Sequence, residues 1–327
     1  MPTADDHPHD VRPSPAEDLD GGVIALDTLT AGMTKVTAGY LLTAPRPTLV
    51  ECGPAISIES VIAGLRELGM DPDDLAYLVL SHIHLDHAGG AGDIAAAFPN
   101  ATIVCSDIGV RHMVDPERLN ASSRRVYGDL FDTVYGACTP IDADRLLGVD
   151  ADLELDLGGG RRLELFAAPG HAKHHIGVFD PDSGDLFVGD SVGVKMPGMD
   201  VIRPATPPPD FDFVLAERTL QRYRDLGPAR VHLAHYGPVD PPHEALVEAS
   251  DRLAEWVRVA DRAWSEDADL DHVVETLGRR FADEVQAVPG DPDAEGRVEL
   301  LSGIRSNAMG LTRYFDLRDQ GRVEPEA

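Results

Sequence analysis

Short apolar runs alternate with helical periodicity through the first third of the chain. Five runs have the length and composition of strands, at residues 23–29, 35–44, 48–53, 75–81 and 101–106. Between them, apolar positions recur at helical spacing over residues 58–69, and residues 92–98 form a shorter helical pattern. Ser57 precedes the longer helix as its expected N-cap. Strands that alternate with helices predict an α/β core built in layers.

The same alternation resumes after a longer helical stretch at residues 109–140. There Tyr127, Phe131 and Tyr135 fall on one helical face, which we expect to pack into the core. The alternatives are a flap over a pocket or a dimer contact. Strand patterns follow, and a run of three glycines predicts a hairpin turn between the first two. These later patterns comprise strands at 151–171, 177–190 and 229–238 and a helix at 213–227.

Three regions differ in composition. Residues 1–22 are acidic and rich in proline, and they lack the basic start and apolar stretch of a secretory signal. We expect a disordered tail there, on a cytoplasmic protein. Residues 23–242 contain the alternating strands and helices of the expected catalytic domain, with 109–140 as its helical insertion. Residues 243–327 are helical and polar, which indicates an appended extension rather than a second catalytic unit.

The charge of the chain is strongly negative. Asp and Glu number 57 against 28 Lys and Arg, a formal net charge of −29, and Lys35, Lys173 and Lys195 are the only lysines. Such a surface repels itself in dilute buffer and is stabilised when salt screens it. We therefore expect a protein of a high-salt cytoplasm. The same field disfavours nucleic acid as a partner, and no window reaches the roughly 18 apolar residues that would favour a membrane span.

The densest chemistry lies in LVLSHIHLDHAGG, which begins at Leu78. His82 and His84 alternate in an extended segment, so their side chains point to the same side. A turn directly after them brings Asp86 and His87 close by. Imidazole nitrogens and a carboxylate suit zinc, and also iron or manganese. Four ligand-type residues directly after a buried strand indicate a metal site.

This HxHxDH motif resembles that of the metallo-β-lactamase superfamily, and the resemblance continues along the chain. AAPGHAKHH supplies His171, LFVGDSVG supplies Asp190 and LAHYGP supplies His235, each after an apolar run that resembles a strand. The resemblance covers about residues 23–242. It implies an αββα sandwich, with the metal centre at one edge between the two sheets.

The resemblance also implies how the ligands are shared between two divalent metal ions. His82, His84 and His171 would hold one ion. Asp86, His87 and His235 would hold the other, and Asp190 would bridge them. We expect zinc, with manganese or iron as alternatives. A water bound to such ions has a pKa near ~7, so hydroxide is available at neutral pH to attack a carbonyl or phosphoryl centre. Asp86 would carry a proton from that water to the leaving group.

Residues around the motif give further candidates. Many relatives have Asp-Thr-Gly after an early strand, where this chain has Glu51-Cys52-Gly53. The carboxylate at this position orients a ligand histidine in the family, and Glu51 would keep that role despite its extra methylene. His174 and His175 follow His171 closely and are candidates for orienting a ligand or contacting substrate, with structural packing as the alternative.

Lys195 lies just beyond Asp190 and is a candidate for holding an anionic group of a substrate, the alternative being a solvated side chain. His232, inside an apolar run, is expected to be internal packing.

The motif set favours a dinuclear metal-dependent hydrolase that cleaves a small-molecule ester, lactone or thioester through a metal-bridging hydroxide. True metallo-β-lactamases lack a bridging aspartate at the position of Asp190, whereas glyoxalase II-like thioesterases, lactonases and phosphodiesterases have one. The alternatives are phosphodiesterase or weak β-lactamase activity at the same site, or non-heme iron redox chemistry on the same fold. The expected partner is a small-molecule substrate, with a homodimer as the other interaction under consideration.

Overall fold

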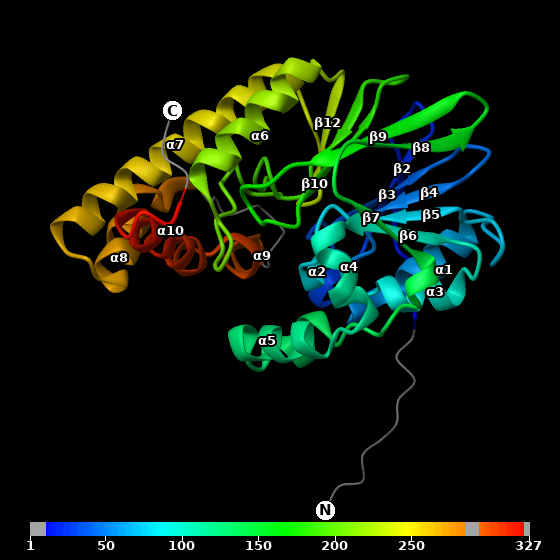
Figure 1. Cartoon of the computed structure of the whole chain (residues 1–327), viewed down its shortest axis with the longest axis horizontal. Helices are drawn as coiled ribbons and strands as arrows, with labels where there is room; N and C mark the ends of the chain where they lie inside the picture. The colour runs from blue at the N-terminus through cyan, green and yellow to red at the C-terminus, as the bar shows by residue number, and fades with distance from the viewer. Residues whose placement is uncertain (1–10, 285–293, 324–327) are drawn as a thin grey trace, which may run out of the picture.

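Two β-sheets packed face to face form the centre of the molecule (Figure 1). The computed structural model describes residues 11–284 and 294–323. The first sheet has the strand order β1-β2-β3-β4-β5-β6-β7, and the second has the order β13-β12-β11-β10-β9-β8. The strands of the first sheet are Ala16–Asp18, Val23–Asp27, Ala38–Leu42, Thr48–Val50, Tyr77–Val79, Thr102–Ser106 and Leu146–Val149. Those of the second, from β8 to β13, are Leu153–Gly158, Arg161–Ala167, Ile176–Asp180, Asp185–Phe187, Arg230–Leu233 and Gly237–Val239.

Apolar side chains fill the space between the sheets and cover both outer faces. Tyr40 and Val79 of the first sheet pack with Leu163 and Phe187 of the second in one buried cluster. On the outer side of the first sheet lie α1 (Ile58–Glu67) and α3 (Ala91–Ala97), which bury Val61, Leu65 and Ile94. On the outer side of the second lies α6 (Phe213–Leu226). The expected order of layers, helix, sheet, sheet and helix, is therefore confirmed.

Strand direction explains why chemistry gathers at one edge. β4, β5 and β6 are parallel, and β11 pairs in parallel with β12. The carboxyl ends of parallel neighbours lie at the same edge of a sheet, and ligands bind there in α/β proteins. The segments that follow β5, β11 and β12 carry most of the motif residues.

Two expectations near the start of the chain need correction. Residues 1–10 of the expected disordered tail lie outside the described residues, but Ala16–Asp18 forms β1 and pairs antiparallel with β2. Its three residues are all exposed, so no apolar alternation could reveal this edge strand. Ser57 stands at the N-cap position of α1, as expected, but its side chain makes no capping hydrogen bond within the described residues. It ends a 3₁₀ turn, Ala55–Ser57, so the chain is already turning before the α-helix begins.

The segment expected to be helical over 109–140 contains α4 (Asp107–Val114), α5 (Glu117–Tyr127) and a π-helical turn, Phe131–Tyr135. In Figure 1, α5 lies apart from the two sheets. Phe131 and Tyr135 are buried with Leu85, and Tyr127 packs against this cluster. The aromatic face is therefore a small core of its own, placed against the helical turn that carries Asp86.

The C-terminal region is helical, as expected, and shares a core with the second sheet. Its helices are α7 (Pro242–Glu266), α8 (Leu270–Arg280), α9 (Ala294–Ser302) and α10 (Ile304–Asp319). The fully buried Trp256 of α7 belongs to the same apolar cluster as Leu220 of α6 and Leu233 of β12. Among the described residues, no helix is both long enough and apolar enough to cross a bilayer.

Candidate metal centre

The structure brings the seven motif residues together at one edge between the sheets, although they come from distant parts of the chain. His82 and His84 lie in the segment after β5, and Asp86 and His87 lie in the short helix α2 (Leu85–Ala88). The remaining three each follow a strand: His171 follows β9, Asp190 follows β11 and His235 follows β12. Each strand ends in a buried apolar run, so the backbone that presents these side chains is fixed by the core.

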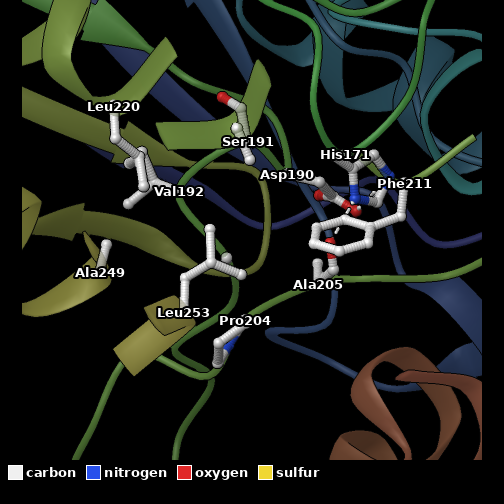
Figure 2. A pocket seen from close by; sticks show the side chains of 12 residues that line it. His171, Asp190, Ser191, Val192, Pro204, Ala205, Phe211, Leu220, Ala249 and Leu253 are labelled. Atoms are coloured by element: carbon white, nitrogen blue, oxygen red, sulfur yellow. Dashed lines mark hydrogen bonds and ion pairs between the residues drawn. The ribbon is translucent and has the colours of Figure 1, made fainter. Parts of the chain in front are cut away.

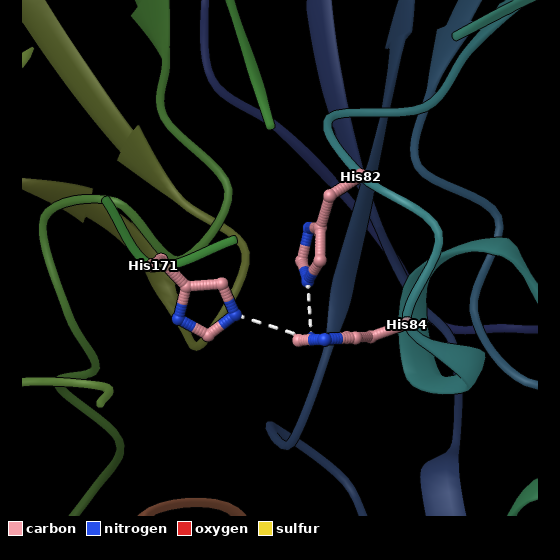
Figure 3. A group of neighbouring side chains, drawn as sticks. All are labelled: His82, His84 and His171. Atoms are coloured by element: carbon pink, nitrogen blue, oxygen red, sulfur yellow. Dashed lines mark hydrogen bonds between the residues drawn. The ribbon is translucent and has the colours of Figure 1, made fainter. Parts of the chain in front are cut away.

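Three imidazoles form the first half of this cluster (Figure 3). His84 Nδ1 lies 2.9 Å from His82 Nε2 and 3.1 Å from His171 Nε2. One nitrogen from each ring therefore points to a common place. His82 is fully buried and His171 nearly so. Three convergent imidazole nitrogens are a ligand set that divalent zinc and its neighbours accept.

The second half contains a carboxylate and two imidazoles. Asp86 Oδ2 lies 3.5 Å from His87 Nε2 and 3.4 Å from His235 Nε2. The two imidazole nitrogens are 3.2 Å apart. All three residues are buried.

Asp190 lies between the two halves. Its Oδ1 is 3.4 Å from His87 Nε2 and 3.3 Å from His235 Nε2. Its Oδ2 is 3.5 Å from His171 Nε2. One carboxylate oxygen thus faces each group of histidines. Oδ1 is buried and has no hydrogen-bond partner among the described residues, which is costly unless a cation or donor satisfies it.

His82, His84 and Asp190 have protonation states that suit a cation. Burial, together with neighbouring imidazoles, lowers the pKa of His82 and His84 well below the ordinary value, so both rings are neutral. Burial alone would raise the pKa of Asp190, but the charges of His235, His87 and His171 outweigh it and hold the pKa well below its usual range. Neutral imidazoles and ionised carboxylates are the forms that bind metal. Burial lowers the pKa of His87 and of His235, but the charges of Asp86 and Asp190 outweigh burial and raise it, so these two rings would release a proton when a cation binds. The cluster of histidines and acids is therefore compatible with a divalent metal site.

Protein atoms behind the cluster fix how the rings are turned. His171 Nδ1 lies 2.9 Å from the Ala205 carbonyl oxygen, and His235 Nδ1 lies 2.7 Å from that of Val36. With their Nδ1–H groups donating to carbonyl oxygens, these rings present Nε2 to the cluster. Backbone carbonyls leave no trace in the residue pattern, so the sequence could not identify Ala205 or Val36.

Glu51 occupies the position expected of it. It is 2% exposed, and its Oε1 lies 3.5 Å from His87 Nδ1. Its Oε2 accepts a hydrogen bond from the Ser81 backbone N–H at 3.4 Å. Both Glu51 Oε1 and His87 Nδ1 are buried, and neither has a hydrogen bond in the part of the chain that the structure describes. A small movement of the ring would pair the two atoms.

The remaining candidates lie close to the cluster in different roles. His174 Nδ1 accepts from the Ile83 backbone N–H at 3.4 Å, and its ring stacks 6.0 Å from that of His82. His175 is 1% exposed, and its Nε2 accepts from the Asp190 backbone N–H at 3.2 Å. Each histidine therefore accepts a hydrogen bond from the backbone of the segment that carries the motif residues. Lys195 is half-buried, its backbone N–H donates to the His235 carbonyl at 2.6 Å, and its ammonium forms no ion pair within the described ranges.

His232 is internal, as expected. It is fully buried, with Nε2 2.7 Å from Asp185 Oδ1. Arg230 pairs with the same oxygen at 2.6 Å.

Two tyrosines of the aromatic face, expected as core with a flap over a pocket or a dimer contact as alternatives, lie within electrostatic range of the cluster. Burial raises the pKa of Tyr127, and the charges of Asp86 and Asp190 raise it further. Burial and, to a smaller extent, the charge of Asp86 also raise the pKa of Tyr135. The two rings lie 4.5 Å apart, and neither hydroxyl has a hydrogen-bond partner in the described parts of the chain. Helical periodicity identified their shared face but not the carboxylates towards which it turns.

A narrow cavity extends from His171 and Asp190 into the interior (Figure 2). Val192, Phe211 and Leu253 are among its apolar walls. The space open to the centre of a water molecule is about 10 Å³, which is room for one water. The cavity is thus too small, as it stands, to hold an organic substrate.

Known proteins are similar to this chain in sequence and in fold. Residues 37–235, more than half of the chain, match the family model described as the metallo-beta-lactamase superfamily. The metallo-beta-lactamase fold-containing protein ST1585 of Sulfurisphaera tokodaii is 36% identical over 199 residues, which cover 59% of this chain and 73% of that protein. The crystal structure of ST1585 from Sulfolobus tokodaii has a TM-score of 0.67 to this chain at 25% identity, covering 89% of this chain and 98% of that one.

Some relatives have enzyme names. The N-acyl homoserine lactonase AttM of Azorhizobium caulinodans is 34% identical over 141 residues, covering 40% of this chain and 46% of that protein. A hydroxyacylglutathione hydrolase of a Synechococcus species is 27% identical over 156 residues, covering 47% of this chain and 48% of that protein. This chain therefore spans less than half the length of either enzyme.

Proposed function

This chain belongs to the metallo-beta-lactamase superfamily, and on that premise we propose that it is a dinuclear metal-dependent hydrolase of a small-molecule ester, lactone or thioester. The observation that carries the proposal is the position of Asp190. One oxygen of its carboxylate faces His87 and His235, and the other faces His171, all at 3.3–3.5 Å. A carboxylate so placed is suited to two cations held side by side, since they need a shared anion.

The ligand atoms fall into two groups, and we propose that each group holds one metal ion. His82, His84 and His171 would hold one, and Asp86, His87 and His235 the other, with Asp190 shared. We propose zinc, because three imidazoles without a thiolate suit it, with manganese or iron as alternatives. The two ions, when bound, supply an ionised water at neutral pH and polarise the carbonyl of the substrate.

Asp86 is suited to move the proton. Burial raises the pKa of its carboxyl, but the His87 charge and the His235 hydrogen bond outweigh burial, and the pKa falls to about 2. Its Oδ2 faces the two histidines, while Oδ1 has no hydrogen bond within the described residues. Oδ1 is therefore the atom that takes a proton from the attacking water and passes it to the leaving oxygen or sulfur.

We propose that two side chains outside the metal cluster, Tyr127 and Lys195, contact the substrate. The Tyr127 hydroxyl lacks a partner in the described structure and lies near the charges of Asp86 and Asp190, so we propose that it donates to the substrate carbonyl. We propose that the Lys195 ammonium, which forms no ion pair with a described residue, holds an anionic group elsewhere on the substrate. Relatives named as a lactonase and as a hydroxyacylglutathione hydrolase support carbonyl substrates over phosphodiesters.

The test uses protein purified in molar KCl and loaded with zinc. A panel of lactones, thioesters, esters and phosphodiesters is assayed with the wild type and with Asp190→Ala. We expect turnover of a carbonyl substrate that the substitution abolishes, while Asp200→Ala, a matched change at an exposed aspartate, retains it. Turnover unchanged in Asp190→Ala would refute the bridging role. Oxygen uptake by an iron-loaded protein, without hydrolysis, would favour the redox alternative instead.

A further inference from the structure

The loop at residues 203–206 connects the candidate metal centre to the C-terminal helices. The Ala205 carbonyl oxygen lies 2.9 Å from His171 Nδ1 and is the acceptor that sets the orientation of this ring. On the other side, Arg203 pairs with Val194 in an isolated β-bridge, so the loop is tied to the segment after Asp190. Any displacement of this loop would therefore move the partner of His171.

Asn307 of α10 holds the loop one residue away from that carbonyl. Its Oδ1 accepts from the Thr206 backbone N–H at 2.6 Å and from the Thr206 hydroxyl at 3.0 Å. Its Nδ2 donates to Ser302 Oγ at 3.1 Å. Thr206 is fully buried and Asn307 is 2% exposed, so these bonds have no competition from water.

Gly310 of α10, Ser302 at the end of α9 and Glu284 make four further contacts with the same loop. A Cβ at Gly310 would lie 1.8 Å from the Thr206 carbonyl oxygen, so backbone packs directly on backbone here. Ser302 Oγ donates to the Pro204 carbonyl oxygen at 3.2 Å. Arg203 donates from Nη1 to the Ser302 carbonyl at 3.2 Å and from Nε to Glu284 at 2.9 Å. Arg203, Pro204 and Thr206 of this loop are thus held by residues of the C-terminal region.

We propose that the C-terminal helices position the ligand His171, with Asn307 as the positioning residue that acts through Thr206 and the Ala205 carbonyl. This inference rests on the metal site of the proposed function. A carbonyl fixed at Nδ1 keeps the proton on that nitrogen and leaves Nε2 free to face His84 and Asp190. Asn307 itself touches none of the seven motif residues through a hydrogen bond or ion pair in the described structure.

The experiment compares four variants of the full-length protein in molar KCl. Asn307→Ala removes the clamp. Thr206→Val removes the hydroxyl, whereas Thr206→Ser keeps it. Met309→Ala is the matched control, because Met309 lies on the same helix and is 40% exposed. For each variant, zinc affinity is measured by competition with a chelator, the cobalt(II)-loaded protein is examined by visible absorption, and the melting temperature of the metal-free protein is recorded.

We expect Asn307→Ala to weaken one of two zinc equivalents by roughly 10- to 100-fold, the range for losing the partner of a ligand histidine. The cobalt spectrum should change with it. Thr206→Val should shift both quantities in the same direction by less, and Thr206→Ser and Met309→Ala should match the wild type. If Asn307→Ala does not fold, the Thr206 pair decides the question, since valine matches threonine in shape.

Failure of this inference can be distinguished from failure of the proposed function. If the wild type takes up two zinc ions and Asn307→Ala and Thr206→Val lower only the melting temperature, with both affinities and the cobalt spectrum unchanged, the helices are merely structural and the inference is overturned. If the wild type itself takes up no zinc, the proposed function fails first.

Discussion

Substituting Glu51 by Gln tests whether the buried carboxylate behind His87 supports metal binding. Glu51 Oε1 and His87 Nδ1 face each other at 3.5 Å, and each is buried without a hydrogen bond to any described residue. A metal ion held at Nε2 of His87 would leave the opposite Nδ1–H to be satisfied by this carboxylate. Gln keeps the shape of the side chain and removes its charge.

The expected magnitude follows from what each substitution leaves behind. Losing a carboxylate partner of a ligand histidine costs roughly 10- to 100-fold in metal affinity, which is about 1.4 to 2.7 kcal/mol. Glu51→Gln should lie near the lower end, because its amide oxygen still accepts a hydrogen bond. Glu51→Asp should lie near the upper end, because losing one methylene withdraws the oxygen by about 1.5 Å from a distance that is already long.

The assay is zinc competition with a chelator in molar KCl, for the wild type, both variants and Glu67→Gln. Glu67 is an exposed acid at the end of α1 and serves as the control for loss of one negative charge. Affinities for both zinc equivalents within threefold of the wild type in Glu51→Gln and Glu51→Asp would refute the reasoning.

Four further predictions use other parts of the structure. Tyr127→Phe should lower kcat by roughly 10-fold or more with little change in metal content, as expected for loss of one donor to a developing oxyanion; an unchanged kcat would remove Tyr127 from the site. Lys195→Met should raise KM for an anionic substrate and leave kcat and neutral substrates unaffected. Burial raises the pKa of Asp185, but hydrogen bonds from His232, Ser183 and Arg230 outweigh it and lower the pKa from 3.8 to about 2. Asp185→Asn should therefore cost about 2 kcal/mol of unfolding free energy at pH 7, with the deficit shrinking as the pH falls from 4 towards 2; a deficit independent of pH would contradict this. Finally, the melting temperature should rise from dilute to molar KCl, because salt screens the net charge of −29.

The layers of the fold and the cluster of seven motif side chains could be predicted, because the sequence patterns that indicate them are local or lie at the ends of strands. His82, His84, Asp86 and His87 sit within one short motif, and the apolar runs before His171, Asp190 and His235 indicate buried strands. The carboxyl ends of such strands converge, which is why residues far apart in the chain meet.

What could not be predicted depends on backbone atoms and on long-range packing. The Ala205 carbonyl that faces His171 carries no residue preference, and the Thr206–Asn307 contact joins positions 101 residues apart with no motif at either end. The face of Tyr127 and Tyr135 was visible as periodicity, but periodicity does not show which neighbour the face meets. The exposed strand β1 has no apolar alternation at all.

The most direct test is anomalous X-ray diffraction from crystals grown with zinc. The account predicts two peaks in each molecule, one about 2.0–2.1 Å from nitrogens of His82, His84 and His171, the other at similar distances from Asp86, His87 and His235, with Asp190 reaching both. A single peak, or peaks away from these side chains, would contradict it.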